Sequence, residues 1–124
     1  MTARDMDRIC SALSTVRVPA RPEEYDIHAA VAGALDAAGL DYAHEYRLGP
    51  RCRIDFAVGR VGIEVKKGRP SAADLTRQLR RYLESEALDG AIVITQRALP
   101  LPATIHGKPV ILITLNRLWG VALP

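Results

Sequence analysis

Asp55, Glu64 and Lys66 are the residues whose types and spacing best suit chemistry in this sequence. They lie in a stretch where apolar residues alternate on both sides of Gly59-Arg60, a pattern that predicts two short strands joined by a two-residue turn. In that register two valines close the turn, and Asp55 lies directly opposite Glu64, with Cβ atoms about 4.5–5.5 Å apart. The pattern therefore predicts a pair of facing carboxylates with a lysine beside them.

Two facing carboxylates need a compensating charge. At about 5 Å they repel by roughly 3 kcal/mol at an effective dielectric near 20. A shared proton, a neighbouring cation or a bound divalent metal would offset this repulsion. Mg²⁺ suits the pair because it binds through one or two carboxylates together with waters and substrate phosphate. Lys66, on the face of Glu64, would contact the phosphate or help to orient and deprotonate a water molecule.

Two alternatives to the metal site arise from the same residues. The first is an edge hairpin whose charges on one face are simply solvated. The second is a three-residue turn, because a one-residue slip in register would send Asp55 and Glu64 to opposite faces of the sheet.

A helix after the hairpin adds Gln78 and Tyr82, which lie one helical turn apart along the edge of an apolar stripe. From there a glutamine amide and a tyrosine hydroxyl could both reach a neighbouring site. The alternative is that Tyr82 packs in the core and Gln78 is an ordinary boundary residue.

Further ligands could come from the preceding strand or from an earlier helix. Glu45 shares the face of Asp55 if the apolar residues of its strand face the core, whereas a minimal loop at Gly49-Pro50 would put His44 in that place. Glu24 and His28 lie one turn apart beside an apolar helix stripe, and either could lean toward the sheet. A solvated or capping role is the alternative for each.

Positive charge is concentrated around the acidic pair. The whole chain has a net charge of +3, but residues 47–81 hold ten Lys or Arg against three Asp or Glu, a net +7, and the first 46 residues hold four against eight, a net −4. This distribution suits binding to a phosphate backbone. The residues that we expect to contact nucleic acid are Arg53, Lys67, Arg69, Arg77 and Arg81.

These residues are placed by a predicted α/β fold. The expected order is helix, helix, three strands, helix, strand and strand, which corresponds to a mixed sheet with an antiparallel meander and a parallel crossover strand, flanked by helices. A loop with two prolines is expected over 98–108. The helices are expected at 4–15, 22–38 and 71–87, and the strands at 42–48, 53–58, 61–66, 91–95 and 110–114.

At 124 residues, the chain is expected to form one domain. Residues 1–21 would be an N-terminal helix and connector, 22–114 the core, and 115–124 a short packing tail. With no signal peptide and no apolar run near the roughly 20 residues that span a bilayer, a cytoplasmic protein without a membrane segment is expected. Cys10 and Cys52 are expected to be unpaired thiols.

The pattern of Asp55 followed by Glu64-Val65-Lys66 resembles the PD-(D/E)xK nuclease superfamily, which has the restriction-endonuclease-like fold. The run from Gln78 to Tyr82 resembles the Q-x-x-x-Y helix of its RecB-like branch, and the order of elements over 22–114 is similar to the superfamily core. Ile54 replaces the proline of the name, and the cysteines that hold an iron–sulfur cluster in some relatives are absent.

The resemblance implies a deoxyribonuclease that hydrolyses phosphodiester bonds through metal-activated water. Asp55 and Glu64 would bind Mg²⁺ or Mn²⁺, Lys66 would assist the attacking water, and Gln78 and Tyr82 would contact or orient DNA and active-site groups. Additional metal ligands would be Glu45 and a residue of the first core helix, where the spacing to Gly39 favours His28 over Glu24.

The resemblance also implies DNA as partner, in a setting such as DNA repair or phage replication. A homodimer, as in compact Holliday junction resolvases, and a larger protein partner are compatible with it. The alternatives in function are a nucleic-acid-binding or regulatory domain that keeps the fold without catalysis, and a structure-specific endonuclease of the junction-resolvase type.

Overall fold

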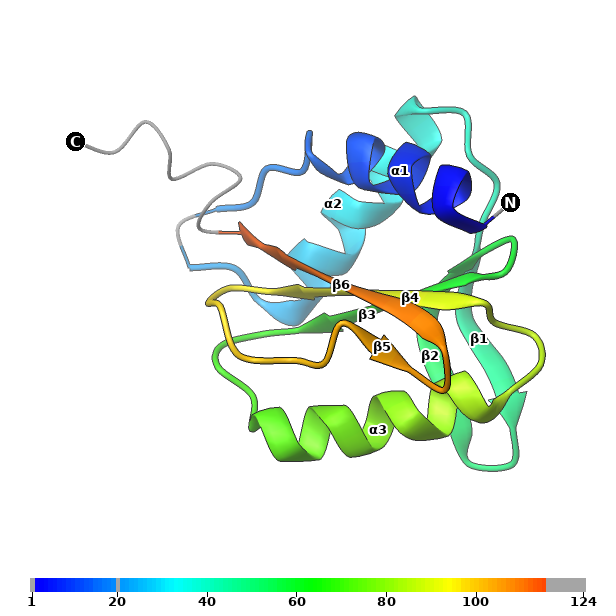
Figure 1. Cartoon of the computed structure of the whole chain (residues 1–124). Coiled ribbons are helices and arrows are strands. Elements are labelled where there is room, and N and C mark those ends of the chain that lie inside the picture. The colour runs from blue at the N-terminus through cyan, green and yellow to red at the C-terminus, as the bar shows by residue number, and fades with distance from the viewer. Residues whose placement is uncertain (1, 20, 116–124) are drawn as a thin grey trace.

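The computed structural model describes residues 2–19 and 21–115, which form a three-layer α/β domain with helices on both faces of a central sheet (Figure 1). Two helices lie above the sheet in this view and the third lies below it. This confirms the predicted α/β class with one mixed sheet. The elements are α1 (Thr2–Leu13), α2 (Glu24–Ala37), β1 (Ala43–Gly49), β2 (Cys52–Val58), β3 (Val61–Lys66), α3 (Ala72–Glu84), β4 (Gly90–Thr95), β5 (Thr104–Ile105) and β6 (Lys108–Thr114).

The sheet has the strand order β1-β2-β3-β4-β6-β5. Strands β1, β2 and β3 form the expected antiparallel meander, and β4 pairs in parallel with both β3 and β6. The helical crossover through α3 is what allows β4 to run parallel to β3. The predicted loop over 98–108 was wrong in part, because it contains the short strand β5, which pairs antiparallel with β6.

The core consists of two apolar clusters, one on each face of the sheet. The first gathers residues of α1 and α2 with Phe56 and the inward side chains of β3 and β4. The second gathers residues of α3, among them Leu79 and Tyr82, with Ile54 and the opposite face of β4. β3 and β4 are therefore buried on both faces, whereas β6, next to the short edge strand β5, is mostly half-buried.

The helix ends differ from the predictions by a few residues, and local hydrogen bonds explain the differences. α2 begins after Glu23, which forms a capping box with Asp26, so the helix starts later than expected. α3 begins as expected after Ser71, whose hydroxyl accepts a hydrogen bond from the Asp74 amide. It ends at Glu84, earlier than the predicted residue 87.

The hairpin register near the turn is the predicted one. Val58 pairs with Val61, and the ladder continues as far as Phe56 and Ile63. One feature of the prediction was wrong: Ile54 and Phe56 do not share a core face, because Ile54 packs in the cluster below the sheet and Phe56 in the cluster above it. The alternation of side chains therefore breaks at residue 55.

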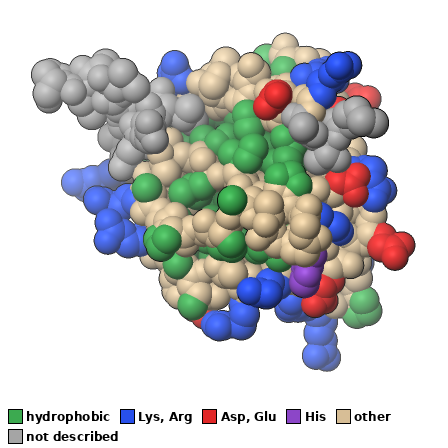
Figure 2. Space-filling view, viewed as in Figure 1, with side chains coloured by type: hydrophobic (Ala, Val, Ile, Leu, Met, Phe, Trp, Pro, Cys, Tyr) green, Lys and Arg blue, Asp and Glu red, His purple; other side chains and the backbone are tan. Residues whose placement is uncertain are grey.

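Charged and apolar side chains occupy different parts of the molecular surface (Figure 2). Figure 2 shows Lys and Arg side chains around the margins of this face, several of them along its left and lower edges, and apolar side chains over its centre. No helix of the described residues is both long and apolar enough to cross a membrane. Cys10 and Cys52 are free thiols, as expected. The predicted tail lies, from residue 116 onward, outside the described residues.

Candidate metal centre and basic groove

The paired ladder of the β2–β3 hairpin ends before Asp55 and Glu64, and we call this open end of the two strands the fork. The ladder ends one pair short of these residues, and each side chain instead contacts the backbone of the other strand. The Val65 amide donates to Asp55 Oδ2 at 2.7 Å, and the Asp55 amide lies 3.4 Å from Glu64 Oε1. The two acids therefore meet at the mouth of the fork, but as a staggered pair rather than the directly opposed pair that the register predicted.

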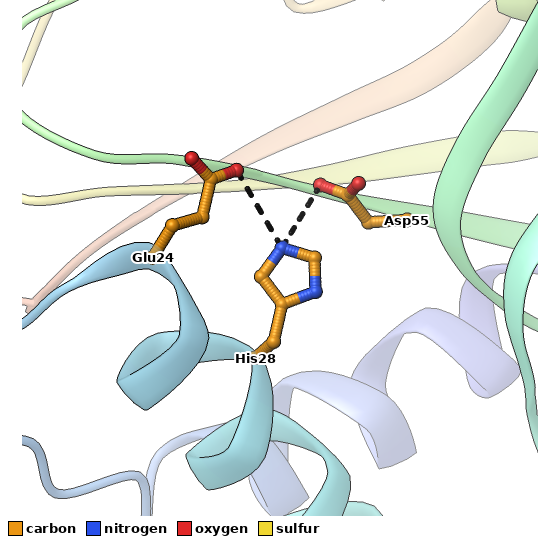
Figure 3. Close-up of side chains that lie close together, drawn as sticks. All are labelled: Glu24, His28 and Asp55. Atoms are coloured by element: carbon orange, nitrogen blue, oxygen red, sulfur yellow. Dashed lines mark ion pairs between the residues drawn. The ribbon is translucent and has the colours of Figure 1, made fainter.

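On one side of the fork, Asp55 meets two residues of α2. Nε2 of His28 lies 3.7 Å from Asp55 Oδ2 and 3.6 Å from Glu24 Oε2. Figure 3 shows both carboxylates turned toward this ring nitrogen. One ligand atom from each of the three residues lies within 4.8 Å of the others. Because Glu24 and His28 occupy successive turns of one helix face, α2 presents both to Asp55 at once.

On the other side of the fork, Glu64 is nearly enclosed. Its side chain is 5% exposed, and Lys66 Nζ lies 3.3 Å from Glu64 Oε2. Tyr82 of α3 approaches from below the sheet, where burial raises the pKa of its hydroxyl and the charge of Glu64 raises that pKa further. The hydroxyl of Tyr82 consequently stays protonated and available as a donor.

Burial also shifts the acids of the fork. It raises the pKa of Glu64 to about 7, with a further contribution from the charge of Asp55 and opposition from Lys66. It raises the pKa of Asp55 as well, against the hydrogen bond from the Val65 amide and the nearby His28. A cation bound next to either acid would favour its charged form and so lower its pKa.

Gln78 and Tyr82 lie one helical turn apart on α3, as predicted, and their side chains are hydrogen-bonded to each other. The Gln78 amide donates to the Tyr82 hydroxyl at 2.8 Å, and that hydroxyl donates to the Arg53 carbonyl at 3.2 Å. Tyr82 is buried within the lower cluster. This chain of hydrogen bonds ties the open end of β2 to α3, so Tyr82 has a structural contact as well as its position next to Glu64.

Glu45 is not part of the cluster that Glu24, His28 and Asp55 form. Its carboxylate lies 3.7 Å from Arg53 Nη1, and the side chain is 52% exposed. His44 takes the place nearest the site instead, with Nε2 3.1 Å from Nδ1 of His28. The predicted minimal loop at Gly49-Pro50 was wrong, because Gly49 pairs with Cys52, Pro50 and Arg51 form the turn, and the register shifts between Arg47 and Gly49.

A groove next to Lys66 runs along α3. It has a volume of about 780 Å³, with Lys66 at one end and Arg77, Gln78, Arg80 and Arg81 along α3. Two of the predicted nucleic-acid contacts, Arg77 and Arg81, therefore line one groove together with Lys66, while Glu24, His28, Asp55 and Glu64 are not among its lining residues.

The other predicted contacts lie outside the groove. Arg53 pairs with Glu45, and Lys67 pairs at 3.0 Å with Glu23, at the start of α2. Arg69 is exposed in the segment that leads into α3. Within the described residues, the structure thus separates a groove lined by arginines of α3 from a more scattered set of basic side chains.

The donor atoms of the fork fit a small divalent cation. Carboxylate oxygens suit Mg²⁺ and Mn²⁺, and the single imidazole nitrogen of His28 is a better ligand for Mn²⁺ than for Mg²⁺. The ligand atoms close enough to share one cation belong to Glu24, His28 and Asp55, whereas Glu64, which was also predicted as a ligand, is not in this group and contacts Lys66 and the Asp55 amide instead. The sequence favours His28 over Glu24 as the helix ligand, whereas the structure brings both to Asp55.

Comparisons of this chain with protein-family models, curated proteins and solved structures gave no match. The function of this chain is therefore inferred from the geometry of the fork and the groove.

Proposed function

We propose that this chain is a metal-dependent deoxyribonuclease of the PD-(D/E)xK type. The observation that supports the proposal most is the fork, where Asp55 and Glu64 exchange contacts between two strands while Lys66 lies against Glu64. Mg²⁺ or Mn²⁺, when bound, would polarise the phosphodiester and activate water for its hydrolysis.

The residues around the cation have separable tasks under this proposal. Asp55, His28 and Glu24, whose ligand atoms lie within 4.8 Å of one another, hold the cation, and Glu64 is the further ligand that the resemblance implies. Lys66, 31% exposed and at the end of the groove, orients the attacking water and stabilises negative charge on the phosphate. Tyr82 holds the open end of β2 in place through the Arg53 carbonyl.

The groove along α3 supports DNA as the substrate. Arg77, Arg80 and Arg81 line it, and arginine is well suited to phosphate oxygens because its guanidinium donates two parallel hydrogen bonds. A strand lying in the groove would bring a phosphate to Lys66. A DNA substrate also suits the cytoplasmic location that was predicted from the sequence. A homodimer or a larger protein partner is compatible with the same chemistry.

A cleavage assay on linear single-stranded, linear duplex and branched DNA tests the proposal, with Mg²⁺, Mn²⁺ or EDTA present. Lys66 and Lys67 provide a matched pair, because they are neighbours of the same type and only Lys66 contacts Glu64. We expect Lys66→Ala to reduce metal-dependent cleavage by about 100-fold or more, a typical loss for one group that stabilises transition-state charge. Lys67→Ala is expected to change cleavage by less than about 3-fold at low salt, as for one phosphate contact.

The second candidate is a nucleic-acid-binding domain without catalysis, which the arginine-lined groove would support equally. This candidate predicts salt-sensitive DNA binding and no metal-dependent cleavage of any of the three substrates. Preference for the branched substrate would instead favour the junction-resolvase type of endonuclease. Cleavage that persists in Lys66→Ala would place the chemistry elsewhere in the chain.

A further inference from the structure

His44 and His28 form a contact that metal ligation alone does not require. Nδ1 of His28 lies 3.1 Å from Nε2 of His44, on the side of the ring away from the two carboxylates. Figure 3 shows this second nitrogen of His28 pointing away from Glu24 and Asp55. The His28 ring therefore uses one nitrogen for the candidate metal centre and the other for His44.

The fold holds His44 in this position by packing and by a backbone irregularity. The His44 ring stacks on Phe56 with centroids 4.7 Å apart, and the His28 ring lies 5.4 Å from the same phenyl ring. The next residue, Glu45, has a φ of 56°, a left-handed conformation that is uncommon for a residue other than glycine. It lies opposite Asp55 in β2, at the level where the alternation of side chains breaks.

The direction of the hydrogen bond between the two rings depends on the cation. A neutral imidazole carries one N–H, so two neutral rings in contact can share a hydrogen bond in either direction. Without a cation, a proton on Nε2 of His28 would face both carboxylates favourably. When Nε2 of His28 ligates a cation, its proton must be on Nδ1, and His44 Nε2 must then accept the hydrogen bond.

We propose that His44 is a positioning residue that accepts the Nδ1–H of His28 and so directs the Nε2 lone pair of His28 at the cation. This role rests on the proposed metal centre. A hydrogen-bond acceptor on the outer nitrogen fixes the orientation and tautomer of a ligating histidine and makes it a stronger ligand. Loss of such a partner typically weakens metal affinity by about 10-fold or more.

Two substitutions separate the hydrogen bond from the packing. His44→Gln keeps an amide oxygen near the position of Nε2 but loses the ring that stacks on Phe56. His44→Phe keeps a ring on Phe56 but has no acceptor. Mn²⁺ affinity measured by calorimetry is expected to stay within about 3-fold of wild type in His44→Gln and to fall about 10-fold in His44→Phe. A packing role predicts the reverse order, which would overturn the proposal.

A spectroscopic measurement on the unsubstituted protein keeps the proposal testable even if a variant fails to fold. In ¹⁵N-histidine-labelled protein saturated with Mg²⁺, we expect Nδ1 of His28 to be protonated and Nε2 of His44 to be unprotonated. Protonation of Nε2 of His44 in that state would overturn the role of His44 and leave the metal centre standing. A wild-type protein that binds neither Mn²⁺ nor Mg²⁺ would overturn both.

Discussion

Near its turn the β2–β3 hairpin is a regular ladder of small and apolar residues, whereas at its open end the same two strands part around two acids. The turn end is also fastened from outside, because Arg60 binds Asp89 at 2.7 Å and so links the turn to the start of β4. At the open end, contacts between side chains and backbone replace the ladder, and α2 and α3 supply the neighbours from opposite faces.

The difference shows how one short hairpin can combine rigidity with a reactive end. Regular pairing near the turn fixes the register of the two strands, and the register fixes the position along the strands at which Asp55 and Glu64 lie next to each other. At the fork, side chains replace the ladder, because the Asp55 amide donates to Glu64 and the Val65 amide donates to Asp55. Burial raises the pKa of both acids in spite of His28, Lys66 and the Val65 amide, so their charged forms destabilise the fold and the open end gives up stability for function.

The largest effect is expected from Asp55→Asn, a substitution that leaves the open end folded but removes its charge. The asparagine oxygen can still accept the hydrogen bond from the Val65 amide. Asp55 is the acid that lies between His28 of α2 and Glu64 of β3. Because its charge is lost, we expect metal-dependent cleavage to fall about 1,000-fold, which corresponds to about 4 kcal/mol of activation free energy. Single-turnover cleavage at saturating Mn²⁺ is the measurement.

The same variant has a control in its stability. We expect the free energy of unfolding of Asp55→Asn, measured in urea with EDTA, to equal or exceed that of the wild type, because burial disfavours the charged form of Asp55. A large loss of stability would mean that Asp55 has a structural role, and the loss of cleavage would then have a different explanation.

At the turn end, the largest effect is expected on stability. A Cβ on Gly62 would lie 2.5 Å from Ile54 Cδ1 and 2.9 Å from Leu88 Cδ1, and both of these side chains are fully buried. Gly62→Val is therefore expected to lower the free energy of unfolding by about 2–3 kcal/mol through overpacking. Urea unfolding measures the loss.

A second glycine provides the control for this substitution. Gly33 is an exposed residue in the middle of α2 with no atom within 4 Å of an added Cβ. We expect Gly33→Ala to raise the free energy of unfolding by about 0.5–1 kcal/mol, since alanine favours the helix. Equal stability losses in the two variants would contradict the proposed tight packing under the turn.

The regular parts of the molecule could be predicted from sequence because their signals are local. Gly59-Arg60 between alternating apolar residues predicted the hairpin turn and its register, and the spacing of Gln78 and Tyr82 predicted that they lie one turn apart on the same helix. The continuous apolar runs predicted β4 and β6, of which β4 is buried along its whole length and β6 is mostly half-buried.

The fork itself could not be predicted, because it depends on irregular backbone. Counting alternate residues placed Ile54 and Phe56 on one face, whereas the break at residue 55 sends them to opposite clusters. The positive φ of Glu45 has no signal in the sequence, and it is next to His44, the neighbour of His28. From the sequence, the prediction of whether Glu45 or His44 lies on the face of Asp55 therefore depends only on the assumed length of the loop at Gly49-Pro50.

The substitution that sharpens the comparison most is Glu64→Gln, with an effect on stability that is expected to be somewhat smaller than that of Gly62→Val. Burial raises the pKa of Glu64 in the folded protein to about 7 from an ordinary value of 4.5. The folded state thus binds this proton more tightly than the unfolded state, so the stabilisation is complete below pH 4.5 and is lost as the pH rises through about 7.

Glutamine keeps an oxygen for the Asp55 amide without the buried charge, and it forgoes the attraction to Lys66. Without metal, we expect Glu64→Gln to be about 2 kcal/mol more stable than the wild type above about pH 8 and nearly equal to it in acid. Urea unfolding across this pH range, with EDTA present, measures the difference. An equal difference at every pH would mean that the charge of Glu64 does not destabilise the fold. A difference that grows with pH, and that disappears when Mn²⁺ is added to the wild type, would mean that the open end of the hairpin is built for a cation.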